Sequence, residues 1–347
     1  MVAMVWLNML KDLSEAIAPP GFEDRVRAYI TARLEEWGFN YEVDRLGNVY
    51  VKLGEGRPVT VVSAHMDEVG FIVRYITEQG FIRVAALGGM NASAAVGTEV
   101  VLLGEQGDVY GVIGATPPHL LKGADAQKQL TVEDLFVDIG ASSREEVLES
   151  GIDVGSPLAF SATFRDLGAS VSGKAFDDRI GCTVLLEALR VSSLPNTGTV
   201  YVVFTVQEEV GLRGALAAAH RLKPDYGIAI EGTIASDVPG VPGQAWVTRL
   251  GGGPALRSMD RTLIANPKLL GYLKRLAREI GVKYQLQLSP ASGTDAGSFV
   301  HVGAASTAIS VPCRYIHSPL ALARKEDVEY TIKLVAGLIE TPPPEKP

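Results

Sequence analysis

The sequence predicts an α/β domain that is interrupted by an all-β insert. Beyond Gly173, apolar β-branched runs alternate with segments of helical periodicity, a pattern that favours a mainly parallel sheet covered by helices. From about Val69 to about Phe160, short alternating segments are punctuated by glycines and show little helical periodicity. We therefore expect two parts of one α/β domain, residues 1–68 and 163–347, on either side of an inserted β domain, residues 69–162.

The individual elements follow from apolar spacing and turn residues. After Pro19-Pro20-Gly21, apolar residues recur every three or four positions, which predicts a helix that ends near Gly38. Short β-branched runs predict strands at 41–43, 49–53, 59–63, 200–206, 228–231 and 306–311. Helical spacing predicts further helices at 180–189, 212–222, 267–280 and 327–339.

Composition limits the class of protein. With 347 residues and 47% hydrophobic content, the chain can bury at least one large core. The formal net charge of -8 leaves no basic surplus for a phosphate backbone, which argues against nucleic acid as a partner. Cys182 and Cys313 are the only cysteines, so a disulfide framework is excluded, and we interpret both as buried, inert thiols.

The N-terminus indicates a cytoplasmic protein. Its apolar stretch acquires charge at Lys11 and Asp12, so it is too short to cross a bilayer. It also lacks a basic region and a small-residue cleavage site, and we expect an amphipathic first helix instead of a signal peptide or a membrane anchor.

Acidic and histidine residues follow the predicted strands at the points where the strands end. Ligands of open α/β sheets bind at the carboxyl ends of strands, so these residues are the candidates for chemistry. They are His65 and Asp67 after the run at 59–62, Glu208 and Glu209 after 200–204, Glu231 after 228–230, and His317 after 309–311, together with Asp177-Asp178 at the start of a helix.

Clustered carboxylates are costly to bury, and a divalent cation is their natural compensation. Two imidazoles with several carboxylates suit zinc, cobalt or manganese better than calcium. The carboxylates exceed what one tetrahedral zinc ion takes, and a short aspartate can bridge two ions through its separate oxygens. The sequence therefore predicts a site with two divalent metal ions, most simply zinc.

The spacing of two residue pairs suggests roles. His65 and Asp67 are two apart on an extended segment, so Asp67 can accept a hydrogen bond from the imidazole nitrogen that faces away from a metal. Glu208 and Glu209 are adjacent, and on an extended segment their side chains point apart. One carboxylate can then bind metal while the other acts as a general base.

Ordinary structural explanations compete with each of these roles. Asp177 or Asp178 alone is as well explained as a helix cap, and Glu208-Glu209 alone as a solvated strand end. A single buried histidine is more often structural than catalytic. Only the repetition of the pattern at several strand ends favours a shared site.

Six motifs, taken in order along the chain, resemble those of the tetrahedral (TET-type) aminopeptidase family, which includes deblocking and glutamyl aminopeptidases. They are Ser63–Gly70, Gly173–Arg179, Gln207–Gly211, Ala229–Thr233, Gly293–Asp295 and Ile316–Pro319. The similarity extends from about Leu10 to Ile339.

The resemblance implies a zinc-exopeptidase α/β/α sandwich with an inserted β-barrel dimerisation domain, and dimers that assemble into a tetrahedral homododecamer. It implies metal-dependent removal of N-terminal residues from peptides with a free N-terminus. The residues that match the family's metal ligands are His65, His317, a bridging Asp177, Glu209 and Glu231; Glu208 matches its general base, and Asp67 the residue that orients His65.

Several questions stay open at this level. Alternatives are a related dinuclear deacylase or carboxypeptidase, a glycoside hydrolase with paired carboxylates, and a scaffold protein that has kept the fold. Substrate-binding residues are unknown, as is the preferred N-terminal residue. His119 is either an incidental turn residue or one that reaches a neighbouring site, and Thr294-Asp295 either lines a pocket or forms a turn. The glycines at 251–253 are weak support for a phosphate site.

Overall fold

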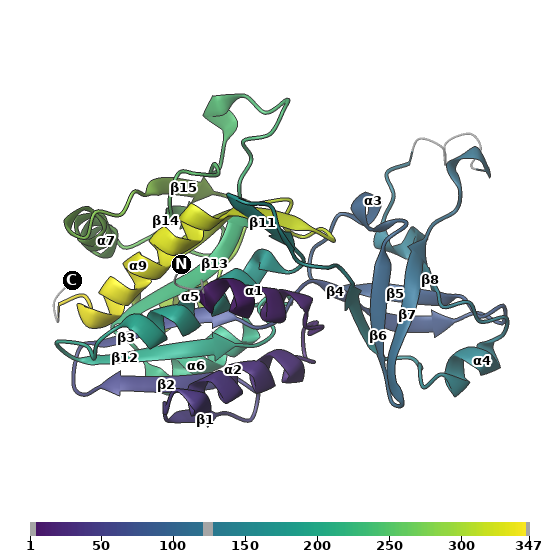
Figure 1. The fold of residues 1–347 in the computed structure, drawn as a ribbon, viewed down its shortest axis with the longest axis horizontal. Helices are drawn as coiled ribbons and strands as arrows, with labels where there is room; N and C mark the ends of the chain where they lie inside the picture. Colours follow the sequence, from purple (N-terminus) through teal and green to yellow (C-terminus); the bar gives the residue numbers. More distant parts are fainter. Residues whose placement is uncertain (1–4, 121–127, 345–347) are drawn as a thin grey trace.

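The structure is a computed structural model that describes residues 5–120 and 128–344. An α/β domain makes up most of the molecule, and a closed β-barrel lies at one end of it (Figure 1). This arrangement confirms the predicted fold class. The barrel strands run from Gly70 to Phe160, inside the expected insert, whose limits at 69 and 162 stay a prediction.

The central sheet is mixed and not mainly parallel. Its main order is β1-β2-β12-β3-β13-β16-β17-β11-β10, with β14 and β15 branching from β16. β12, β3, β13 and β16 pair in parallel, whereas the margins of that order are antiparallel. The strands are β1 (Tyr41–Val43), β2 (Val49–Gly54), β3 (Val59–His65), β10 (Arg165–Asp166), β11 (Ser170–Gly173), β12 (Thr199–Thr205), β13 (Tyr226–Ile234), β14 (Ala255–Asp260), β15 (Gln285–Ser289), β16 (Ala305–Arg314) and β17 (Ala321–Arg324).

A short connection explains one antiparallel margin. Between β1 and β2, the Asp44 carboxylate accepts hydrogen bonds from the backbone N–H groups of Leu46, Gly47 and Asn48. A turn this tight joins only antiparallel strands, because a parallel pair needs a long crossover. The expectation of a mainly parallel sheet was therefore wrong at the margins and correct in the centre.

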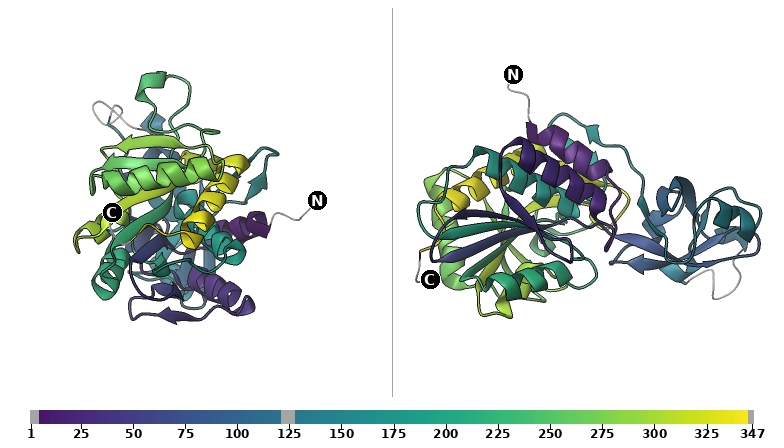
Figure 2. Two further views of the ribbon diagram at one scale, coloured as in Figure 1. Left: turned by 90° about the vertical axis from the view of Figure 1, so that its left-hand side faces the viewer. Right: turned by 90° about the horizontal axis from the view of Figure 1, so that it is seen from below.

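Helices cover both faces of the sheet (Figure 2). One face carries α1 (Val5–Glu15), α2 (Asp24–Glu36), α5 (Phe176–Val191), α7 (Pro267–Glu279) and α9 (Lys325–Glu340), and the other carries α6 (Arg213–Leu222) and α8 (Ala296–Val300). Within the described residues, no helix is both long and apolar enough to span a membrane.

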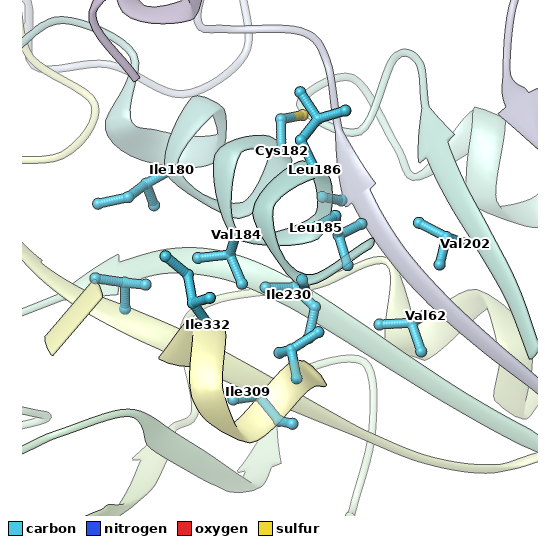
Figure 3. Packing of buried hydrophobic residues seen from close by; sticks show 14 of the residues in the cluster. Val62, Ile180, Cys182, Val184, Leu185, Leu186, Val202, Ile230, Ile309 and Ile332 are labelled. Carbon is cyan, nitrogen blue, oxygen red and sulfur yellow. The ribbon is translucent and has the colours of Figure 1, made fainter. Parts of the chain in front are cut away.

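The largest core lies between α5 and the parallel centre of the sheet (Figure 3). Ile180, Val184 and Leu185 are fully buried on α5. Opposite them lie Val62 of β3, Val202 of β12, Ile230 of β13, Ile309 of β16 and Ile332 of α9. This packing fixes the start of α5 against the ends of the parallel strands.

The insert closes into a barrel with its own core. Its strand order is β4-β5-β8-β7-β6-β9, and closure leaves no free sheet edge within it. Its elements are β4 (Gly70–Ile76), β5 (Ile82–Leu87), α3 (Ala92–Ala95), β6 (Glu99–Gly104), β7 (Gly107–Gly114), β8 (Phe136–Asp138), α4 (Arg144–Glu149) and β9 (Pro157–Phe160). Phe71 and Phe160 pack edge to face inside it, with ring centroids 5.6 Å apart.

Candidate metal centre

The parallel strands bring the candidate residues to one edge of the sheet. His65 is the last residue of β3, Glu231 lies in β13, Glu208 and Glu209 follow β12, and His317 follows β16. Together with Asp177, at the start of α5, these residues line one cavity of about 640 Å³. The structure thus brings together all five expected ligands and the expected base, although they come from distant parts of the chain.

Asp177 lies between the two imidazoles. Its Oδ1 is 3.3 Å from His65 Nε2, and its Oδ2 is 3.3 Å from His317 Nε2. Burial would lower the pKa of each imidazole, but the neighbouring carboxylates raise that of His317 to about 9 and that of His65 well above its usual value. Contact through both carboxylate oxygens is what a residue bridging two cations requires.

Asp67 is fully buried beneath this pair and organises two neighbouring segments. Its carboxylate lies 3.4 Å from His65 Nδ1, and the backbone oxygen of Asp67 lies 3.2 Å from the same nitrogen. The two carboxylate oxygens also accept hydrogen bonds of 3.0 Å from the backbone N–H groups of Glu208 and Glu209. Asp67 therefore contacts the imidazole of His65 and holds the backbone of the segment that carries both glutamates.

The expectation that Glu208 and Glu209 diverge is wrong. A ligand atom of each lies within 4.8 Å of the other and of a His65 ring nitrogen. The reason is that the chain leaves the extended conformation after β12. Gln207 has a left-handed φ of 56°, and the Glu208 carbonyl accepts hydrogen bonds from the N–H groups of Gly211 and Leu212.

Glu231 lies in the same cavity with different partners. Its Oε2 is 3.4 Å from the Arg257 guanidinium, and its Oε1 accepts hydrogen bonds from the Thr294 hydroxyl and the Asp295 N–H. The closest groupings of possible ligand atoms are His65 with Glu208 and Glu209, and Asp177 with Glu209 and His317. Glu231 belongs to neither grouping among the described residues, although it faces the shared cavity.

The electrostatics of the cluster fit a cation. Burial raises the pKa of Glu208 well above its usual value, raises that of Glu209 to about 7, and raises that of Glu231. Glu209 Oε1 is buried and accepts no hydrogen bond among the described residues, and the His317 imidazole lies beside it, with Nε2 3.5 Å away. A buried carboxylate oxygen that accepts no hydrogen bond is costly, and a divalent ion bound here would offset that cost.

Asp178 has a positioning role that the sequence did not reveal. Its Oδ2 accepts a hydrogen bond of 3.0 Å from the N–H of His65, and its Oδ1 accepts bonds of 2.9 and 3.0 Å from the N–H groups of Gly181 and Gly232. The bond to Gly181 is the expected helix cap. The other two bonds tie α5 to the strand ends that carry His65 and Glu231.

Other residues noted in the sequence lie outside the cluster. Asp295 is buried below the cavity, where its Oδ2 accepts a 2.5 Å hydrogen bond from the Thr205 hydroxyl, so it does not line the cavity. His119 is an exposed residue of a short 3-10 turn in the barrel domain. The N–H groups of Gly251 and Gly253 donate to the Asp327 carboxylate, which explains this glycine run without a phosphate.

The barrel domain also reaches the cluster. A Cβ added to Gly88, in the loop after β5, would lie 3.1 Å from Glu209 Cβ, and one on Gly89 would lie 3.9 Å from His317 Nδ1. The Asn91 N–H donates to the His317 carbonyl at 3.4 Å. A side chain at Gly88 would crowd Glu209, whereas one at Gly89 would only reach ordinary contact with His317, and the loop forms one wall of the site.

Two imidazoles, a shared aspartate and a turn with two glutamates at the ends of the central parallel strands define a metal-dependent hydrolase. Comparison with known proteins identifies the family. The model of the M42 glutamyl aminopeptidase family matches residues 47–334. The chain belongs to this family.

Individual relatives support the same family assignment. The chain is 34% identical to the lysyl aminopeptidase of Pyrococcus furiosus, over 97% of each chain. A TET aminopeptidase from a marine sediment archaeon, Thaumarchaeota archaeon SCGC AB-539-E09, superposes with a TM-score of 0.92 at 39% identity, over 96% of each chain. The Pyrococcus horikoshii TET1 peptidase, described as assembling into a tetrahedron or a large octahedral shell, gives 0.85 at 33% identity, over 96% of this chain and 99% of that one.

These findings confirm the predicted activity. The protein is a metal-dependent aminopeptidase, and its family implies bound divalent metal ions. The chemistry of the donor set fits such ions, as does Glu209 Oε1, which accepts no hydrogen bond among the described residues. Among the activities weighed from the sequence, the aminopeptidase is the one that the family supports.

Asp178→Asn tests the positioning role. An amide offers one acceptor oxygen, so its NH₂ group must face at least one of the three backbone donors. We expect a destabilisation of about 1–3 kcal/mol in urea unfolding, as for other buried donors that lose an acceptor, and weaker metal binding in calorimetric titration. Asp166→Asn is the control, because this exposed carboxylate pairs with Lys325 at the surface, and we expect less than about 0.5 kcal/mol. Equal effects of the two substitutions would contradict the role.

The metal-free protein should lose stability as the pH rises from about 5 to about 8. Folding raises the pKa of Glu209 to about 7 and that of His317 to about 9, so the folded state holds protons that the unfolded chain has already released. Above this window Lys174, whose burial lowers its pKa to about 8, acts in the opposite direction. Thermal unfolding of chelated protein measures the trend. Saturating metal should reverse it, because ligands must be deprotonated to bind. If the thermal unfolding midpoint of the chelated protein instead rose with pH across this window, the assignment of raised pKa values to Glu209 and His317 would be wrong.

Proposed function

We propose that the protein removes N-terminal residues from peptides by means of two divalent ions held by His65, Asp177, Glu209, Glu231 and His317. The observation that carries the proposal is the position of Asp177, whose separate oxygens lie 3.3 Å from each imidazole. Asp177 is the bridging ligand in this assignment. His65 and His317 are terminal ligands of different ions, and Glu209 and Glu231 complete the two sites.

When bound, the ions would polarise the scissile carbonyl and lower the pKa of water. Glu208 is the general base. Its carboxylate lines the cavity and its Oε2 lies 4.0 Å from His65 Nε2, so it can take a proton from water at the cluster and return it to the leaving amine. Asp67 keeps the segment with Glu208 in place and fixes the tautomer of His65.

Zinc is the proposed metal, and cobalt or manganese would also suit the site. Two imidazole nitrogens and several carboxylate oxygens match the ligand preferences of these ions. The proposed substrates are peptides with a free N-terminus. The acidic net charge of -8 supports peptides over nucleic acids, and we propose no membrane partner.

We further propose that the barrel, residues 69–162, is a dimerisation domain and that dimers assemble into a tetrahedral homododecamer. The similarity to the Pyrococcus horikoshii peptidase, which assembles into a tetrahedron or an octahedral shell, supports this assembly. Residues 1–68 and 163–347 form the catalytic domain in this proposal. A cytoplasmic location is supported by two cysteines that are both free and buried.

Glu208→Gln separates the base from the metal ligands. We expect metal content near that of the unmodified protein and a loss of turnover of at least about a hundredfold, as for a removed general base. Glu209→Gln is the contrast, because it removes a proposed ligand and should lower the metal content measured by elemental analysis. Near-normal turnover of the Glu208 variant would refute its assignment as the base.

Chelation tests the dependence on metal and the end of the substrate that is recognised. Activity on aminoacyl para-nitroanilides should disappear after EDTA treatment and return with zinc, cobalt or manganese. N-acetylated peptides should not be cleaved, because the acetyl group removes the free amine. Cleavage of acetylated peptides at similar rates would instead favour a deacylase or a carboxypeptidase.

A further inference from the structure

A buried carboxylate outside the metal centre contacts the turn that carries the two glutamates. Glu23 lies immediately before α2 and is 3% exposed. Its Oε1 accepts hydrogen bonds from the N–H of Gly21 at 2.8 Å and from the N–H of Gln207 at 3.1 Å. The first bond is local. The second joins residues 184 positions apart and ends on the residue directly before Glu208.

Helix capping does not account for this carboxylate. The side chain of the residue before a helix often accepts a hydrogen bond from the free N–H groups of the first turn. Within the described part of the chain, the Glu23 side chain makes no such bond to α2. Only its backbone carbonyl serves the helix, by accepting the Arg27 N–H at 2.9 Å. The carboxylate is directed instead at the turn that follows β12.

Burial of Glu23 is unfavourable unless its acceptor is needed. Burial and the nearby Asp67 carboxylate raise the pKa of Glu23, and the N–H groups of Gly21 and Gln207 oppose that rise. A buried acid close to a second one loses hydration and meets like charge. Its hydrogen bonds must therefore compensate, and one of the two goes to the turn.

Four consecutive N–H groups of this turn are accepted by buried side chains from the first part of the chain. They are the N–H of Val206, bound to Asn48, that of Gln207, bound to Glu23, and those of Glu208 and Glu209, both bound to Asp67. Successive N–H groups that point the same way form a concave site for anions. Here the anions are carboxylates of the protein itself.

Glu23 and Asp67 hold different parts of the turn. Asp67 holds the two glutamates, whereas Glu23 holds Gln207, the residue with the left-handed φ of 56°. Residues other than glycine rarely adopt this conformation, and it persists only where the surroundings impose it. The Gln207 carbonyl is also bound, by the Arg213 N–H at 3.2 Å. The bond from Glu23 thus acts at the point where the chain changes direction.

We propose that Glu23 is a positioning residue that fixes the left-handed turn at Gln207 and thereby aims the Glu208 carboxylate into the cavity. The inference rests on the proposed function, in which Glu208 is the general base. Glu23 is absent from the described residues that line the cavity, so it acts on the reaction through the turn. Misplacement of a catalytic group by about 1 Å can lower a rate by about a hundredfold.

Three substitutions of Glu23 separate the acceptor from the charge. Glu23→Gln can keep the one oxygen that accepts both hydrogen bonds, so kcat should stay within about threefold of the unmodified enzyme. Glu23→Met removes the acceptor at similar length, and Glu23→Asp draws it back by one methylene. For both we expect kcat to fall by at least about tenfold with KM nearly unchanged, because no residue in the cavity is altered. Metal content should stay near normal, since Asp67 still holds the N–H of Glu209.

A double-substitution cycle distinguishes positioning of the base from a general loss of structure. With Glu208→Gln there is no base to aim, so adding Glu23→Met should lower the residual kcat by less than about threefold. Asp327→Leu is the matched control, because it also removes a buried carboxylate that accepts two backbone N–H groups, those of Gly251 and Gly253. It should lower the urea midpoint as Glu23→Met does and leave kcat within about twofold.

The inference is overturned if Glu23→Met lowers kcat by the same factor with and without Glu208→Gln. It is equally overturned if Glu23→Gln is as impaired as Glu23→Met, or if metal content falls in step with kcat. Glu23→Asp, which keeps the charge, takes the place of Glu23→Met in the cycle if the methionine variant does not fold. If the unmodified protein cleaves no aminoacyl substrate in the presence of metal, or if Glu208→Gln turns over normally, the proposed function has failed, and this inference fails with it.

Discussion

The burial of several carboxylates at one edge of the sheet is the constraint on which the site depends. Like charges of this kind repel one another and lose their hydration, so each needs a donor or a cation. The fold supplies donors from the backbone: Asp67 accepts the N–H groups of Glu208 and Glu209, and Asp178 accepts those of His65 and Gly232. The parallel pairing of β12, β3, β13 and β16 makes this possible, because it ends four strands side by side. Cations would satisfy the carboxylate oxygens that accept no hydrogen bond from these donors, such as Glu209 Oε1 among the described residues.

Much of this could be predicted from the sequence, because strand ends are visible as apolar runs followed by polar residues. His65, Glu231 and His317 were found in this way, and each lies in the cavity. The direction of Glu208 and Glu209 could not be predicted, since it depends on the left-handed conformation of Gln207, which has no side-chain signature of the glycine kind. The role of Asp178 was equally hidden, because two of its three donors are backbone groups more than fifty residues away in sequence.

The strands on the far side of β16 were less predictable than the centre of the sheet for a related reason. β14, β15 and β17 are short, and β15 alternates between buried and exposed residues, with Leu286 and Leu288 on the exposed side. Their apolar content does not distinguish them from loops in a single sequence. Yet β14 carries Arg257 and leads into Arg261, so the part of the fold that was hardest to foresee supplies the cationic wall of the cavity.

The loop after β5 has a consequence for how the molecule can be rebuilt. Gly88 and Gly89 approach Glu209 and His317 so closely that a methyl group on Gly88 would already crowd the glutamate, and Gly88 has a φ of 89° that other residues rarely adopt. The inserted barrel therefore cannot be exchanged for another domain without changing the metal centre. If the barrel were replaced by one from another protein, or deleted and its ends joined by a short linker, the cavity of the metal centre would lose one wall. This would hold even if the sheet and helices folded normally.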